Sequence, residues 1–182
     1  MTDEKTTLKD AIDARGPLAV WDLMTEDEKK SAAAALWLNA DRESRMAVEM
    51  VLAKDMKFRP QSVKKLSAER VAPRLARLAS DLPETAFFQF LFHLHMAERR
   101  ELMVEYLDSV GLPHKEGVLD LPDDAEAPTA EAATGPAREL LAKHGRVALI
   151  YLGTLVVADA AFWDGITGVL EEWDEDGESC ES

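Results

Sequence analysis

Residues 89–98 hold the side chains best suited to metal binding or proton transfer in this chain of 182 residues. His93, His95 and Glu98 lie close together, and Gln89 precedes His93 by four positions. On a helix His93 and His95 diverge by about 200°, so they cannot chelate one ion together, and His95 with Glu98 supplies only two ligands. We therefore predict no metal site and interpret both histidines as core residues hydrogen-bonded to the backbone or to Gln89. A small-ligand or enzymatic pocket near His93, His95 and the neighbouring phenylalanines remains the alternative.

Other arrangements that support catalysis are missing from the sequence. The single cysteine, Cys180, lies in an acidic stretch that disfavours the reactive thiolate. The nine glycines are dispersed, and neither a Gly-x-Ser-x-Gly elbow nor a Gly-Lys-Ser/Thr phosphate loop occurs. We expect no catalytic residue and no cofactor.

Residues 54–77 could bind through charge, because they contain eight basic side chains and only two acidic ones. We use the name basic stripe for five of them: Lys64, Lys65, Arg70, Arg74 and Arg77. The three arginines follow one another at i, i+4 and i+7, a spacing that places them on one helix face. Two hypotheses fit this pattern. The stripe is either a solvated face or a contact surface for an acidic partner or for the chain's own acidic C-terminal part.

Helices are the elements that must position these side chains. A capping box at Thr25–Glu28 predicts a helix to about Leu38, and Asp41 begins another that ends before Pro60. Pro73 is expected to split the basic region, and Pro83 and Pro136 to open further helices. The segment after Pro83 is apolar nearly all round, with Phe88 and Phe92 among its side chains, which predicts burial on most sides.

The segment 147–157 fits a strand by its valine content and a buried helix by its length and surroundings, and we choose helix. The predicted fold is all-α, a bundle or short irregular array of helical hairpins with about eight helices.

Charge divides the chain unevenly. Residues 120–182 hold 15 of the 35 acidic side chains but three of the 21 basic ones. We predict a main helical part at 1–119, an acidic linker rich in Ala and Pro at 120–135, a helical arm at 136–173 and a disordered tail at 174–182. The arm is too small to fold alone, so it should pack on the main part or on a second chain.

The composition limits the partners. No secretory signal is expected at the start, and the longest apolar stretch, 147–158, is too short to span a bilayer, so we expect a soluble cytoplasmic protein. A net charge of −14 opposes binding to nucleic acid or to an anionic membrane. We favour a non-catalytic interaction or adaptor protein that binds a protein partner or associates with itself.

Overall fold

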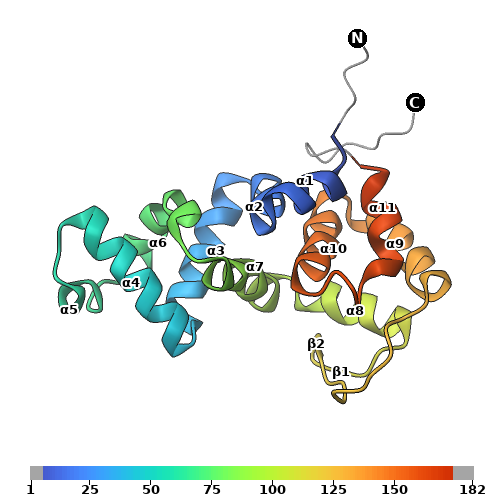
Figure 1. The fold of residues 1–182 in the computed structure, drawn as a ribbon. Coiled ribbons are helices and arrows are strands. Elements are labelled where there is room, and N and C mark those ends of the chain that lie inside the picture. Colours follow the sequence, from blue (N-terminus) through green and yellow to red (C-terminus); the bar gives the residue numbers. More distant parts are fainter. Residues whose placement is uncertain (1–5, 174–182) are drawn as a thin grey trace, which may run out of the picture. The chain divides into compact units, whose positions relative to one another are not determined.

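The computed structural model describes residues 6–173 and is built almost entirely of helices (Figure 1). It is 73% helical, with 11 α-helices, two short 3-10 turns and one two-stranded hairpin among the described residues. The all-α prediction is confirmed. The helices outnumber the predicted eight because several connections contain short helices, such as α5 (Pro60–Val63) and α11 (Thr167–Glu171). The predicted disordered tail at 174–182 lies outside the described residues.

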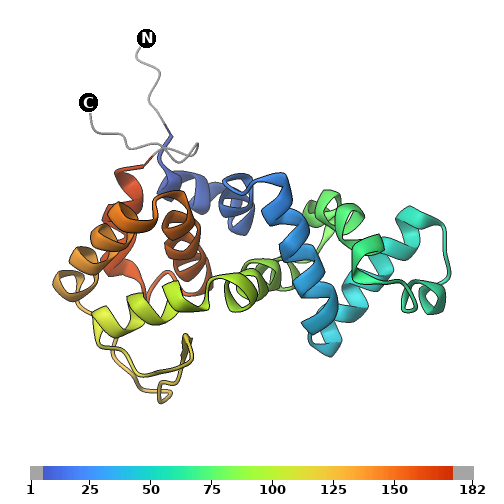
Figure 2. The same cartoon turned by 180° about the vertical axis from the view of Figure 1, so that it is seen from behind.

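The chain divides into two compact units, each traced by its colours in Figures 1 and 2. Unit 2 is the continuous segment Met24–Glu98, and unit 1 combines Met1–Leu23 with Arg99–Ser182. This division does not coincide with the charge boundary at residue 120, which lies inside unit 1 directly after the hairpin.

Unit 2 is built around one helix against which two others pack. Its elements are α3 (Glu26–Asn39), α4 (Arg42–Met56), α5, α6 (Ala68–Arg77), the 3-10 turn η1 (Ala79–Asp81) and α7 (Glu84–Glu98). Helix α3 contacts both α6 and α7, and α4 contacts α7. Buried alanines of α3, among them Ala32, Ala33 and Ala35, permit these close approaches.

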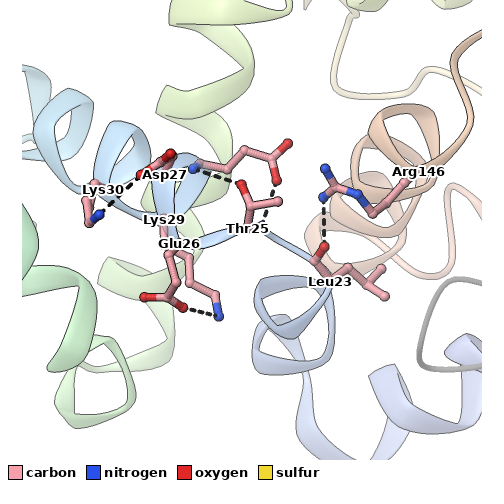
Figure 3. Close-up of polar contacts among 8 residues, drawn as sticks. Leu23, Thr25, Glu26, Asp27, Lys29, Lys30 and Arg146 are labelled. Carbon is pink, nitrogen blue, oxygen red and sulfur yellow. Dashed lines mark hydrogen bonds and ion pairs between the residues drawn. The ribbon is translucent and has the colours of Figure 1, made fainter.

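The start of α3 shows why this segment is helical (Figure 3). The Thr25 hydroxyl accepts a hydrogen bond from the Glu28 amide at 3.2 Å, and the Glu28 carboxylate accepts one from the Thr25 amide at 2.8 Å. Ion pairs join Lys29 to Glu26 and Lys30 to Asp27 within the first turns. The reciprocal bonds satisfy amides that a helix end leaves without partners, so the predicted capping box is confirmed.

A polar network fixes the orientation of α4 on α3. Arg45 lies 3.7 Å above the Trp37 ring, donates to the Trp37 carbonyl and pairs with Glu49 at 3.1 Å. Glu49 is only 5% exposed and lies 3.5 Å from the Lys64 ammonium, while the Trp37 indole donates to the Leu66 carbonyl at 3.1 Å. A buried carboxylate needs such partners, so this network sets which side of α4 faces inward.

The prediction that the segment after Pro83 is buried on most sides is confirmed in part, because every side chain from Ala86 to Met96 is buried or half-buried, but full burial is confined to one face. Helix α7 buries one face, which comprises Ala86, Phe87, Phe90, Leu91, Leu94 and His95. Phe88, Phe92 and His93 are only half-buried. Within unit 2, α3 and α4 are the helices that pack on α7. The apolar side chains of α7 extend round more of the helix than the face that these two helices bury.

Two prolines predicted to interrupt or open helices lie inside them instead. Pro73 is within α6, where Val71, Ala72 and Leu75 are buried on either side of it. Pro136 is within α9 (Ala130–His144), so residues 130–135 of the predicted linker are helical. Packing of the flanking residues outweighs the lost backbone hydrogen bond. At Pro136 the preceding residue is Gly135, which has no Cβ to clash with the proline ring.

Unit 1 surrounds helix α10 (Arg146–Ala158). Its other elements are α1 (Leu8–Arg15), α2 (Pro17–Asp22), α8 (Arg100–Val110), β1 (His114–Lys115), β2 (Val118–Leu119), α9, the 3-10 turn η2 (Asp164–Ile166) and α11. Helix α10 buries most of its residues and contacts α1, α2, α9 and α11, so the choice of helix for 147–157 is confirmed.

The arm predicted at 136–173 lies against α1, α2 and α8, which all come from the first 119 residues. Arg146 donates to the Leu23 carbonyl at 2.8 Å (Figure 3). The rings of Tyr106 (α8), Tyr151 (α10) and Trp163 form a cluster with centroids about 6 Å apart. None of the helices between residues 6 and 173 has the length and apolarity needed to cross a bilayer.

Candidate interaction surface

The histidines of α7 lie in different surroundings. His95 is buried on the inner face, whereas His93 is half-buried and packs edge-on against Phe92 with centroids 5.5 Å apart. Burial lowers the pKa of His93, and the nearby charge of Asp41 partly opposes this. Gln89 donates to the Asp41 carboxylate, which also caps α4 by accepting from the Ser44 amide at 2.8 Å. Gln89 thus connects α7 to the cap of α4.

Two polar clusters in unit 1 hold elements together. His114 accepts from the Gly117 amide at Nδ1, 3.2 Å away, so its neutral ring carries the proton on Nε2 and donates it to Asp108 at 3.0 Å. Both ring nitrogens therefore stabilise the hairpin.

The second cluster joins α8 to α9. Glu105 of α8 pairs with Lys143 at 2.7 Å. Hydrogen bonds from Lys143 and, to a smaller extent, from His144 lower the pKa of Glu105. Among the described residues no group of three His, Cys, Asp or Glu side chains could hold a metal ion.

The structure separates the five residues of the basic stripe into two groups. Arg74 pairs with Asp55 of α4 at 2.8 Å, and Lys64 pairs with Glu49. Lys65, Arg70 and Arg77 are exposed, and they form no ion pair with any residue that the structure describes.

Further exposed cations of unit 2 share this property. We call the whole group the unpaired cations, since none has an ion pair within residues 6–173. They are Arg42, Lys54, Lys57, Arg59, Lys65, Arg70 and Arg77. In unit 1, by contrast, Lys9, Arg15, Arg100, Arg138 and Lys143 all pair with carboxylates. Unit 2 has 12 basic and 11 acidic side chains, a net charge of +1, and unit 1 has nine and 24, a net charge of −15. The whole net negative charge of the chain therefore belongs to unit 1.

Unit 2 also carries the large apolar side chains that are most exposed. Met46 and Met50 are 53% and 65% exposed, Leu38 is 70% exposed and Phe58 is 42% exposed. The two methionines lie one turn apart on α4, whose opposite face buries Val48 and Leu52. We call Met46 and Met50 the methionine ridge.

A cleft adjoins the ridge on the other side of Lys54. It has a volume of about 390 Å³ and is lined by Val51, Lys54 and Asp55 of α4 with Leu78 and Asp81 near η1. The lining combines half-buried apolar groups with charges of both signs, which suits a side chain of a partner better than a fully enclosed ligand.

Comparison with known proteins adds no family. No family model, no curated protein and no solved structure matches this chain. A helical fold alone does not specify a function, whereas the chemistry of a surface can.

Proposed function

We propose that this chain is a non-catalytic interaction protein that binds an acidic segment of a partner protein through the α4–α6 side of unit 2. The observation that carries the proposal is the group of unpaired cations beside exposed apolar side chains. Exposed cations that form no ion pair can engage a partner without first breaking one, unlike the five paired cations of unit 1.

The expected affinity comes from several weak contacts. Each exposed ion pair contributes about 0–1 kcal/mol, so the seven unpaired cations can supply binding that falls as salt rises. The methionine ridge adds apolar area, and methionine's flexible side chain adapts to partners of different shape. Such a surface combines apolar contact with charge recognition.

The charge of the whole chain favours a protein over nucleic acid as the acidic partner. A net charge of −14 repels a polyanion with evenly spaced phosphates. An acidic protein segment carries fewer charges and also offers apolar side chains for Met46 and Met50.

A small-ligand or enzymatic role near His93 and His95 has less support. His95 is buried, and the cleft at α4 and η1 is lined by other residues. We therefore keep the protein-binding role as the proposal.

The test measures binding of a fluorescent acidic peptide, 20 residues of Glu and Asp with interspersed Leu, to the whole chain. Arg70→Glu with Arg77→Glu should weaken binding at least fivefold. The matched control is Lys30→Glu with Lys115→Glu, which makes the same change in net charge at exposed positions outside α4 and α6 and should change affinity less than twofold. Equal binding by the two variants would contradict the proposal. Tighter binding of a single-stranded oligonucleotide than of the peptide would contradict it as well.

A further inference from the structure

We infer that the methionine ridge receives one face of an acidic amphipathic α-helix, so that the partner segment binds as a helix lying along α4. This inference rests on the proposed function and specifies the conformation and the side chains of the bound segment.

The ridge has the dimensions of a helix-packing surface. At 100° per residue, Glu43, Met46, Met50 and Lys54 lie within an arc of about 80° on α4. From Met46 to Lys54 the axial rise is about 12 Å, or roughly two helical turns. Rows of side chains four residues apart are the ridges that pack into the grooves of a second helix.

The inner side of α4 is held by separate contacts, so the ridge is a fixed surface. Arg45 and Glu49 join α4 to Trp37 and Lys64, and Val48 and Leu52 are fully buried. Rotation of α4 to bury Met46 and Met50 would expose these apolar side chains and break the Glu49 pairs, so the methionines stay outside.

A helix is favoured over an extended segment because of the backbone. The backbone groups of α4 are used within the helix, so this face offers an incoming chain only side chains. An extended peptide needs a strand edge for its own amides and carbonyls, and the strands among residues 6–173 have only two residues each, in unit 1. A helical segment satisfies its own backbone and needs only side-chain contacts.

The charges give the pattern of the partner helix. Lys54, Lys57 and Arg59 follow the ridge at the C-terminal end of α4 and are unpaired. The partner should carry Leu, Met or aromatic side chains four residues apart to contact the ridge. Glu or Asp should follow one turn further along, opposite these cations.

The experiment compares three synthetic peptides on the whole chain. The first is an 18-residue acidic peptide with Leu at helical spacing on one face, and the second has the same residues scrambled so that no apolar face forms. The third equals the first but contains two central prolines. We expect the first to bind at least tenfold more tightly than either of the others. Met46→Ser with Met50→Ser should abolish this difference, whereas Leu38→Ser, at an equally exposed apolar position outside the ridge, should preserve it.

The outcomes separate the two proposals. If the first and scrambled peptides bind equally well and Arg70→Glu with Arg77→Glu weakens both, the helix inference is wrong and the proposed function stands. If no acidic peptide binds, both are wrong. If the first peptide binds equally well to the double serine variant, the helix lies elsewhere and the inference is overturned. If sedimentation shows self-association that the serine variant loses, the ridge's occupant is a second copy of this chain, which also overturns it. Because both methionines are exposed, the serine variant should unfold at the wild-type urea concentration.

Discussion

Substituting Gly153 by alanine should destabilise unit 1, although alanine is the better helix former. Gly153 lies in the middle of α10, where a Cβ atom would be 3.0 Å from Val20 Cγ2 and 3.6 Å from Ile12 Cδ1. Val20 is fully buried and branched at Cβ, so it cannot rotate away at low cost. Gly168 provides the matched control, because it is also helical and a Cβ there would contact nothing within 4 Å.

The two effects that compete at Gly153 can be estimated. Replacing glycine by alanine inside a helix contributes about 1 kcal/mol of stability, partly by restricting the unfolded chain. Overpacking a tightly filled site costs about 1–3 kcal/mol. Gly153→Ala should therefore lower the free energy of unfolding by up to about 2 kcal/mol, while Gly168→Ala should leave it unchanged or raise it by up to about 1 kcal/mol.

Urea denaturation followed by circular dichroism measures both variants, provided that the denaturant slope stays constant. Hydrogen exchange of the α10 amides would locate the change in unit 1. Val20→Ala removes the nearest methyl groups, so combining it with Gly153→Ala should cost at least about 0.5 kcal/mol less than the sum of the two single changes. A Gly153→Ala protein as stable as the Gly168→Ala protein would refute the close approach of α10 to α2.

Three further outcomes can be measured by the same denaturation assay. Phe90→Ala should cost about 3–5 kcal/mol because Phe90 is fully buried, and the half-buried Phe88 should cost less than half as much; equal losses would contradict the one-sided burial of α7. Tyr106→Phe should be neutral or stabilising by up to about 1 kcal/mol, since the buried Tyr106 hydroxyl has no hydrogen-bond partner within the described residues; a loss above about 1 kcal/mol would reveal such a partner. Burial lowers the pKa of His93 in the folded protein below its ordinary value of about 6.5. The contribution of His93 to the free energy of unfolding is therefore fully present above about pH 6.5 and is lost as the pH falls toward the lower pKa of the folded protein. Replacing His93→Gln should therefore reduce the loss of stability between about pH 7 and pH 5, and an unchanged pH profile would contradict this assignment.

Local signals in the sequence were sufficient to predict that these segments are helical and where several of the helices begin or end. Thr25 and Asp41 cap α3 and α4 as expected, and Gly111 ends α8 in the left-handed conformation with a φ of 77°. These features depend on bonds between residues within about four positions of each other, so the pattern contains the information needed. Pro73 and Pro136 led to wrong helix boundaries, because the cost of the lost backbone hydrogen bond is offset by packing against residues far along the chain.

The candidate surface shows more clearly that local patterns do not reveal which distant residues meet in the fold. The sequence identified the basic stripe by its charge. It did not show that Arg74 and Lys64 form ion pairs, because their partners Asp55 and Glu49 come within reach only in the folded unit. Likewise, the apolar pattern of α4 admits either of two inward faces, and the buried Glu49 with its two cations excludes the one that contains Met46 and Met50.

The division into units changes what the charge asymmetry means. Along the sequence, acidity begins at residue 120, which suggested an acidic arm on a balanced body. In the fold, residues 1–23 join 99–182 through the packing of α1 and α2 on α10 and α11, and the segment between them forms unit 2. The acidic excess therefore belongs to one unit and the unpaired cations to the other. Unit 2 is nearly neutral and leaves seven cations without an ion pair among the described residues and two methionines exposed, whereas Lys9, Arg15, Arg100, Arg138 and Lys143 of unit 1 pair with carboxylates.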